Sequence, residues 1–336
     1  MNKNSYLKFT EISVGGTIVR PVLVTAIKEA LDKNSNTYVK ISMRDGLTDI
    51  TAMMFKTTKD MLENTGITEG CIADVKVSVS EYNGSKSYRV DSISRTEDTS
   101  LTTSDFMKSP PIPVEDMYNE ICELIRSCAN DYNGKYIPIS ELALNILEDK
   151  KDKYLTSSAA VSMHHNMKGG LIYHSYRMVK AADALCGVYT NLDRELMICG
   201  AALHDIGKIW EYKTSPVGEA EFTASGVLFG HIYLGASVIK QYTDGKNYNF
   251  EKVHLLIHMI LSHHGTREFG AVVCPATAEA FALHFIDNID AKLYVCEENN
   301  ELLEPGTVTE KKPFGLDNRI YKPKMPRETT RTPDSV

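Results

Sequence analysis

The sequence predicts a multidomain protein in which an all-β domain is followed by an all-α domain. The chain has 336 residues, enough for two domains that each bury a core. In the first hundred residues, apolar and polar side chains alternate, as in strands. From Val114 almost to residue 300, apolar residues recur every three or four positions, as in helices. A Ser/Thr/Pro-rich segment without periodicity, 96–113, lies between the two patterns and predicts a linker.

The first domain is expected to contain five strands and one short helix. The strand patterns cover residues 17–31, 37–46, 47–55, 71–82 and 86–94. A helical pattern at 57–64 lies between the third and fourth strands, and Asn83-Gly84 is a hairpin signal. This layout is that of the OB-fold, a small barrel that often binds oligonucleotides.

The pattern divides the chain into four segments. We expect an OB-fold nucleic-acid-binding domain at 1–98, a linker with connecting helices at 99–158, a helical domain at 159–300 and an extended tail at 301–336. The tail is expected because it carries proline and charge but little periodicity.

Composition favours a protein of the cytoplasm. The chain is 43% apolar and 24% charged, as globular proteins are. Its seven cysteines form no CxxC pair, so we expect free thiols in a reducing compartment and not a disulfide framework or a zinc finger. No signal-peptide core begins the chain, and no apolar stretch is long enough to cross a bilayer, so we expect no membrane partner.

The net charge of −7 does not favour indiscriminate nucleic-acid binding. Residues 1–95, however, hold 13 basic against 11 acidic residues, so a local basic groove on the first domain is compatible with the total. Candidates for stacking on bases are Tyr38, Phe55, Tyr82 and Tyr88, and candidates for phosphate contacts are Lys40, Arg44, Lys86 and Arg89. For each aromatic residue, a place in the barrel core is the alternative.

Histidines are concentrated in the helical region, where nine of the ten lie between residues 164 and 264. One helical histidine is ordinarily a surface or core residue, but here they recur with carboxylates beside glycines. In CGAALHDIGK, His204 and Asp205 end a predicted helix just before Gly207. A bare buried carboxylate is unfavourable there, because a helix C-terminus already carries partial negative charge. A bound divalent cation would remove that cost.

Imidazole and carboxylate ligands favour Mn²⁺, Fe²⁺, Zn²⁺ or Ni²⁺ over Ca²⁺ or Mg²⁺. The number of candidate ligands allows two ions, bridged by the carboxylate that follows a ligand histidine. Two ions suit displacement at phosphorus, because they generate a hydroxide near neutral pH and stabilise the attacking and leaving oxygens. We expect a divalent transition metal cofactor with two ions, and manganese as the metal.

Blocks of the helical region resemble a known enzyme family. His174, His204-Asp205 and Asp287 are similar to the His, His-Asp, Asp signature of HD-superfamily metal-dependent phosphohydrolases. The blocks HHNMKGGLIYHS, GAALHDIGKIWE, GHIYLG, HMILSHHGTREFG and EAFALHFIDNIDAK resemble those of the YhaM-type 3′→5′ exoribonucleases, which also place an OB-fold before an HD domain. The resemblance implies that the helical segment 159–300 is an HD domain.

The resemblance also implies roles for single residues. The implied metal ligands are His174, His204, Asp205, His231, His263, His264 and Asp287. Asp205 is the implied bridge, and Asp205 and Lys208 are the implied catalytic residues, with Lys208 on the scissile phosphate. Arg267 is a second candidate for binding the substrate phosphate, although an exposed loop arginine is the alternative.

Four other histidines and one aspartate have weaker expectations. His164 and His165 are candidates for the site entrance, whereas His254 and His258 are expected to serve packing. Asp290 is expected either behind a metal ligand or on the helix surface.

Together these features predict a metal-dependent 3′→5′ exonuclease that hydrolyses single-stranded RNA to nucleoside 5′-monophosphates, with DNA as a further substrate left open. An HD phosphohydrolase acting on a nucleotide or cyclic dinucleotide is the alternative. A third reading, a catalytically idle nucleic-acid-binding module, is disfavoured by the intact ligand set. Homo-oligomerisation is left open.

Overall fold

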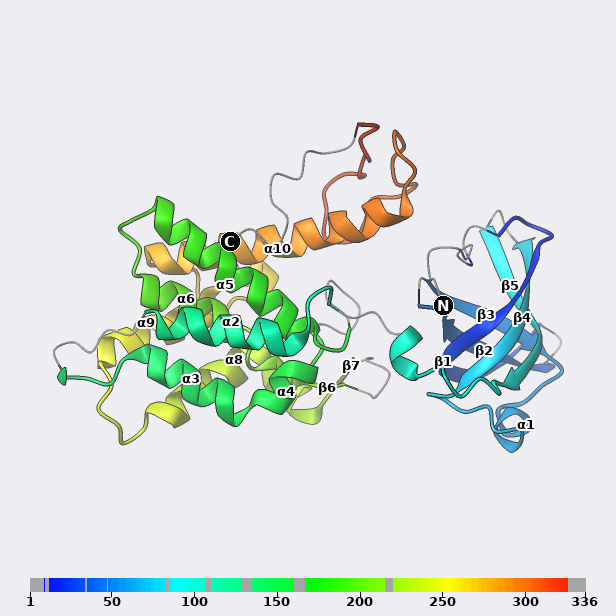
Figure 1. Cartoon of the computed structure of the whole chain (residues 1–336), viewed down its shortest axis with the longest axis horizontal. Helices are drawn as coiled ribbons and strands as arrows, with labels where there is room; N and C mark the ends of the chain where they lie inside the picture. The colour runs from blue at the N-terminus through cyan, green and yellow to red at the C-terminus, as the bar shows by residue number, and fades with distance from the viewer. Residues whose placement is uncertain are drawn as a thin grey trace. The chain divides into compact units, whose positions relative to one another are not determined.

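The computed structural model describes residues 9, 12–33, 35–46, 48–82, 85–106, 110–128, 134–159, 167–214 and 220–325. The chain forms two compact units, a barrel unit that comprises residues 1–109 with 214–219, and a helical unit that comprises 110–213 with 220–336. Figure 1 shows the strands of the first unit and the helices of the second. The predicted order, a β domain followed by an α domain, is confirmed.

The barrel unit is a closed five-stranded barrel. Its strands are β1 (Thr17–Leu31), β2 (Thr37–Arg44), β3 (Asp49–Phe55), β4 (Ile72–Tyr82) and β5 (Ser85–Arg95). The strand order is β1-β2-β3-β5-β4, with β4 pairing back on β1, and α1 (Lys59–Asn64) connects β3 to β4. This is the OB-fold that the sequence predicts. The predicted Asn83-Gly84 turn lies outside the described residues.

Part of the predicted linker segment folds onto the barrel. Residues 103–106 form the short 3₁₀ helix η3 (Thr103–Phe106), and Phe106 is buried against Leu23 of β1. The Asp105 carboxylate also accepts hydrogen bonds from the main chain and hydroxyl of Thr102. Two apolar residues, Phe106 and the half-buried Leu101, hold this segment to the barrel, and two are too few to define a periodicity in the sequence.

The helical unit contains most of the predicted helices in the expected order. They are α2 (Val114–Arg126), α3 (Ile139–Asp149), α4 (Lys151–Thr156), α5 (Gly170–Val188), α6 (Arg194–Leu203), α7 (Lys208–Glu211), α8 (Ala224–Thr243), α9 (Phe250–Ser262) and α10 (Ala278–Leu302). A two-stranded sheet of β6 (Tyr212–Thr214) and β7 (Ala220–Phe222) separates α7 from α8, and η5 (Arg267–Phe269) follows α9.

Helix α6 lies at the centre of this unit. It packs against α3, α5, α9 and α10, and every residue from Glu195 to Leu203 is buried. The small residues of its CGAA run are explained by this crowding, because a Cβ on Gly200 would lie 2.5 Å from the Met259 methyl group. The C-terminal end of α6 therefore delivers His204 into the interior.

The segment after α10, predicted as an extended tail, makes local contacts with itself. After α10, Val308 and Tyr321 form an antiparallel bridge, and Ile320 is buried. Thr309 N donates to Ile320 O at 2.9 Å, and Lys322 N donates to Thr307 O at 3.0 Å. The chain thus folds back on itself before residue 325, through too few pairs to produce a strand pattern. Among the described residues, no helix combines the length and apolar content needed to cross a bilayer.

Candidate metal centre

Five segments of the helical unit bring the predicted ligands together. His174 lies on α5, and His204 and Asp205 follow α6 directly. The remaining ligands come from α8, from the end of α9 and from α10, and they are His231, His263, His264 and Asp287. All of these side chains are buried or half-buried.

The ligand atoms form two clusters. In the first cluster (His174, His204 and Asp287), ligand atoms lie within 4.8 Å of one another. His174 Nε2 is 3.0 Å from His204 Nε2 and 3.3 Å from Asp287 Oδ1. In the second cluster (His231, His263 and His264), the ligand atoms also lie within 4.8 Å of one another. Each cluster offers three donors, which is the number that catalytic metal sites commonly use.

Asp205 lies between the two clusters and presents one carboxylate oxygen to each. Its Oδ2 is 3.3 Å from His204 Nε2 and 3.7 Å from His174 Nε2. Its Oδ1 is 3.5 Å from His231 Nε2 and 3.7 Å from His263 Nε2. One carboxylate oxygen thus faces each cluster, which is the geometry that the predicted bridging role would require.

Three of the imidazoles are oriented by main-chain carbonyls. His204 Nδ1 is 2.9 Å from Ala201 O, and His263 Nδ1 is 2.7 Å from Ile260 O. His264 Nδ1 is 2.8 Å from Phe269 O. A carbonyl oxygen can only accept a hydrogen bond, so each Nδ1 carries the proton and each Nε2 keeps a lone pair for a metal.

The other two imidazoles are oriented by carboxylates. His174 Nδ1 lies 2.7 Å from Asp290 Oδ2, and His231 Nδ1 lies 2.9 Å from Glu211 Oε2. Asp290 is buried behind the ligand His174, which is one of the two places predicted for it, and not on the helix surface. Its Oδ1 lies 2.5 Å from Arg177 Nε. Sequence reasoning missed Glu211 and Arg177, although Glu211 falls inside the matching block GAALHDIGKIWE.

The unsatisfied atoms of the site fit a divalent cation. Asp205 Oδ1, His231 Nε2 and His263 Nε2 are buried and have no hydrogen-bond partner among the described residues. Buried polar atoms are ordinarily paired, because an unpaired one costs about 1–3 kcal/mol. A metal ion would satisfy all three at once. The set of five imidazoles and carboxylates suits a transition metal better than Ca²⁺ or Mg²⁺.

The charges of the site are consistent with this fit. Burial alone would raise the pKa of Asp205, but the Lys208 ammonium and the nearby imidazoles hold that pKa well below its usual range. Burial lowers the pKa of both His263 and His264, so their rings are neutral and ready to ligate. Burial would lower the pKa of His174 too, yet Asp287 and Asp290 raise it to about 9. Without a metal, the His174 ring is therefore protonated on both nitrogens and positively charged at neutral pH.

Glycines allow the segments to approach this closely. A Cβ on Gly207 would lie 1.9 Å from His231 O, so α8 can pass beside the His204-Asp205 turn only if residue 207 has no side chain. A Cβ on Gly265 would lie 2.3 Å from the His284 ring, and Gly265 has a φ of +79°. His284 Nδ1 in turn is 2.8 Å from His263 O and so holds the main chain of a ligand.

The remaining predicted residues lie in different surroundings. Lys208 Nζ is 2.6 Å from Asp205 Oδ2, at the site. Arg267 is exposed on η5, and within the described part of the chain it forms no ion pair with the clusters. His258 Nε2 accepts a hydrogen bond from Ala276 N, whereas His254 is exposed and its ring lies against the exposed ring of Phe250. His164 and His165 lie outside the described residues.

The barrel offers a separate candidate surface on the outer face of β2 and β3. Tyr38 and Phe55 are paired in register, and their rings stack with centroids 5.4 Å apart. Exposed Lys40 pairs with Met53, which in turn pairs with Arg89 of β5. This outer face (Tyr38, Lys40, Met53, Phe55 and Arg89) combines aromatic rings with cations, as surfaces for single strands do.

Other barrel candidates are less suited to bind a strand. Tyr88 packs against the barrel core, so for this residue the core alternative is the right one. Arg44 is paired with Asp49, at 2.5 Å, as Arg89 of the outer face is with Asp91, at 2.9 Å. Tyr82 is exposed at the end of β4, and Lys86 is exposed near the start of β5.

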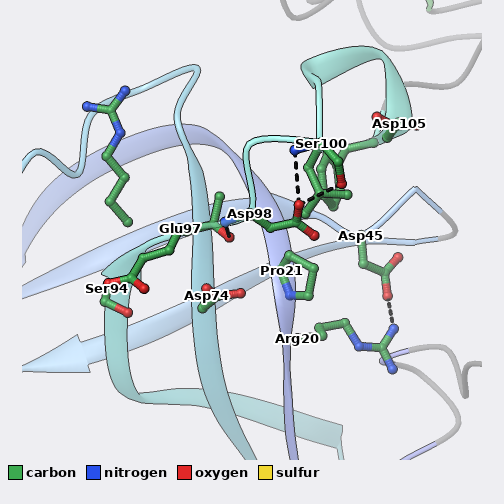
Figure 2. Close-up of a pocket in the computed structure, with 13 residues that line it drawn as sticks. Arg20, Pro21, Asp45, Asp74, Ser94, Glu97, Asp98, Ser100 and Asp105 are labelled. Atoms are coloured by element: carbon green, nitrogen blue, oxygen red, sulfur yellow. Dashed lines mark hydrogen bonds and ion pairs between the residues drawn. The ribbon is translucent and has the colours of Figure 1, made fainter. Parts of the chain in front are cut away.

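The cavity of the barrel unit does not fit a phosphate backbone. It has a volume of about 650 Å³ and lies between β1, β4 and the segment that ends at Phe106 (Figure 2). Its lining includes two arginines and five acidic residues, which are Arg20, Arg95, Asp45, Asp74, Glu97, Asp98 and Asp105. Arg20 is ion-paired with Asp45. The acidic excess would repel a nucleic acid, so the outer face is the better candidate.

Residues 171–292 match the HD domain family, and this range contains all seven predicted ligands. The HD domain indicates a metal-dependent phosphohydrolase. The observed architecture is therefore an OB-fold followed by an HD domain.

Solved structures with detectable similarity include one isolated OB-fold domain and two aspartyl-tRNA synthetases. The second OB-fold domain of replication protein A from Methanococcus maripaludis is 19% identical, over 28% of this chain and 96% of that chain, with a TM-score of 0.22. A putative aspartyl-tRNA synthetase from Leishmania major Friedlin is 14% identical over 34% and 30%, with a TM-score of 0.20. Aspartyl tRNA synthetase from Entamoeba histolytica is 14% identical over 55% and 37%, with a TM-score of 0.21. This chain thus spans about a third of each synthetase, and the OB-fold assignment rests on its strand order.

Proposed function

We propose that this protein is a 3′→5′ exonuclease that hydrolyses single-stranded RNA to nucleoside 5′-monophosphates with two divalent ions, manganese being the preferred metal. The observation that carries the proposal is the position of Asp205 between two clusters of oriented imidazoles, with unpaired buried atoms turned toward one another. The direction of cleavage and the RNA substrate are supported by the resemblance of the sequence blocks to exoribonucleases of this architecture.

The residues of the site have two different roles toward the phosphate, namely holding the ions and contacting a phosphoryl oxygen. Two bound ions would supply a nucleophile at neutral pH and neutralise the negative charge of the phosphate. His174, His204 and Asp287 would hold one ion, His231, His263 and His264 the other, and Asp205 both. Lys208 is 12% exposed, so its ammonium lies at the rim, where it can donate to a phosphoryl oxygen as charge builds there.

The outer face of the barrel supports a polymeric substrate. The stacked Tyr38 and Phe55 rings present π-faces on which bases can stack whatever their sequence, and exposed Lys40 is placed to contact a phosphate, whereas Arg89 would have to leave its ion pair with Asp91 to do so. A mononucleotide or cyclic dinucleotide substrate would leave this exposed aromatic pair without a role. For that reason we favour RNA over the alternative phosphohydrolase activity.

The test is incubation of the full chain with 5′-labelled single-stranded RNA and Mn²⁺, with product lengths followed in time. We expect labelled products that shorten stepwise from the 3′ end, and nucleoside 5′-monophosphates released. EDTA and Asp205→Ala should both stop the reaction, which excludes a contaminating nuclease. Discrete internal cuts would contradict the proposal. Inert RNA together with hydrolysis of a cyclic dinucleotide would establish the alternative.

A further inference from the structure

Glu211 is a buried carboxylate next to the second cluster. It ends α7, and its main-chain oxygen accepts a hydrogen bond from Thr223 N at 2.9 Å. A Cβ on Gly226 would lie 2.2 Å from the same oxygen, so the start of α8 packs directly on Glu211. The position of this carboxylate is therefore fixed by the fold.

The Glu211 carboxylate holds His231 at two points. Its Oε1 accepts a hydrogen bond from the main-chain N–H of His231 at 3.0 Å, and its Oε2 lies 2.9 Å from His231 Nδ1. These contacts fix both the backbone and the ring of one ligand. The second contact turns Nδ1 toward the carboxylate, so the opposite ring nitrogen, Nε2, faces Asp205 Oδ1, 3.5 Å away.

The backbone at His231 needs an anchor such as Glu211, because it follows a kink, whereas the backbone at the other ligands is not kinked in this way. Helix α8 is kinked at Gly230, whose φ of 68° and ψ of 159° are accessible to glycine and strained for other residues. The N–H that follows the kink is the one that Glu211 accepts. His263 and His264, in contrast, hold their rings against carbonyls of their own neighbourhood, Ile260 O and Phe269 O.

We propose that Glu211 is a positioning residue for one metal ion, so that the second cluster binds its divalent transition metal tightly only while Glu211 is a carboxylate. The first cluster is independent of Glu211, because Asp290 and Ala201 O orient its two histidines. This inference rests on the two-ion centre of the proposed function, but not on the identity of the substrate.

Glu211→Gln breaks one of the two contacts without changing the size of the side chain. A glutamine offers one acceptor oxygen and one NH₂ group, so it can accept from only one of the two N–H groups of His231, and its NH₂ would face the other. Loss of a partner behind a ligand typically weakens metal binding about 10–100-fold. We expect that loss for one Mn²⁺ ion of two, the same ion that His231→Ala loses.

Glu195→Gln is the matched control. Glu195 is also a buried glutamate of the helical unit, and it accepts a hydrogen bond from Ser140 N at 3.0 Å and pairs with Lys252 at 2.5 Å. It lies nine residues before His204, which is about 14 Å along α6 at 1.5 Å per residue. This variant loses a buried carboxylate but should keep both ions.

The measurement is calorimetric titration of the metal-stripped full chain with Mn²⁺, with melting curves that show each variant to be folded. We expect two tight ions for the wild type and for Glu195→Gln, and one tight ion for Glu211→Gln. Glu211→Asp keeps both acceptor oxygens on a shorter stem and should weaken the same ion less. Two tight ions in Glu211→Gln, or the loss of both, would overturn the inference. A wild-type chain that binds a single ion would instead overturn the two-ion centre itself.

Discussion

The metal centre and the outer face of the barrel are built in opposite ways. At the metal centre, His174, His204, Asp205 and His263 are at most 3% exposed, and each imidazole has an identified partner behind it. On the outer face, Phe55 is 47% exposed and Lys40 and Arg89 are exposed as well. Chemistry at one phosphorus atom needs fixed donors, whereas binding of a strand with any sequence needs open rings and mobile cations.

This difference predicts that substitutions in the two regions have different consequences. A change at the metal centre should remove turnover or a metal ion, because each group has one geometry and no substitute. A change on the outer face should weaken strand binding in a graded way, because several exposed groups share the contact. The predictions below test this division, from the largest expected effect to the smallest.

The largest effect is expected for Asp205→Ala. Both carboxylate oxygens face imidazoles of different clusters, so the variant loses the group that both ions would share. We expect RNA hydrolysis to fall below detection and metal binding to weaken, while strand binding to the barrel persists. Activity on labelled RNA, metal content and a strand-binding titration check these three points. Asp205→Asn, which keeps the shape but not the charge, should behave alike; full activity in either variant would refute the bridge.

A smaller effect is expected for Lys208→Ala. Its ammonium is 2.6 Å from Asp205 Oδ2 and reaches the rim of the site. Loss of one donor to a developing charge typically lowers turnover about 10²–10³-fold. We expect that loss with both ions and RNA affinity retained, and partial recovery in Lys208→Arg, because a planar fork replaces a compact ammonium imperfectly.

Single-turnover cleavage and elemental analysis distinguish the possible roles of Lys208. A variant that cleaves at the wild-type rate would mean that Lys208 is a helix-end charge only. A variant that loses metal would mean that Lys208 positions the Asp205 carboxylate and does not contact the phosphate. Arg267, on the exposed η5 turn, would then be the next candidate for the phosphate contact.

Several of the predicted ligands carry local marks in the sequence, whereas His174 and Asp287, within helices, are predicted from the resemblance of whole blocks. His204, Asp205 and His263 sit at helix ends beside glycines that the packing requires, and short blocks carry those marks. The partners behind the ligands could not be predicted in the same way. Glu211 contacts a histidine 20 residues later, and Arg177 contacts an aspartate 113 residues later, so only the fold brings them together.

In the barrel too, the sequence predicts local features but not which distant segments pair. Alternation along β5 means that Tyr88 and Arg89, as neighbours, point to opposite faces, and the buried Val90 places Tyr88 inward. Alternation alone thus separates core from surface residues. It does not show that Met53 of β3 pairs with Arg89, because that parallel contact closes the barrel between distant segments.

A moderate effect is expected on the outer face. Stacking of one base on an aromatic ring contributes about 1–3 kcal/mol, so Tyr38→Ala or Phe55→Ala should weaken RNA binding about 5–150-fold. Cleavage of a small activated phosphodiester should not change, because that substrate has no further base to stack on these rings. Tyr88→Phe is the matched control, since this ring packs inward and the change keeps its volume. Equal losses on RNA and the small substrate would contradict the division of roles.

The smallest effect concerns pH and the metal-free chain. Asp287 and Asp290 raise the pKa of His174 to about 9, above its ordinary value of about 6.5. A raised histidine pKa contributes stability that is fully present below pH 6.5 and is lost as pH rises toward 9. The melting temperature in EDTA should therefore fall by a few degrees over this window. The rise in melting temperature on addition of Mn²⁺ should become larger as pH increases, because the metal binds in place of the second proton of His174.

Melting curves at pH 6.5, 7.5 and 9, with EDTA and with Mn²⁺, check this expectation. His174→Gln should remove the fall between pH 6.5 and 7.5 in EDTA, whereas His254→Gln, a change at an exposed histidine, should keep it. At pH 9 the buried Cys122 and Cys199 thiols, whose pKa values burial raises, add a loss of their own. His263 and His264 do not mask the effect, because their pKa values are lowered and they are neutral throughout the window. A flat wild-type profile in EDTA would contradict the assignment.

The central claim is that one carboxylate joins two metal ions in the helical unit. Electron paramagnetic resonance of the full chain during titration with Mn²⁺ tests it most directly, because two manganese ions bridged by a carboxylate are magnetically coupled. We expect saturation at two ions per chain and a coupled spectrum in the wild type, with coupling lost in Asp205→Ala. Two ions that give independent six-line spectra, or saturation at one ion, would contradict the account.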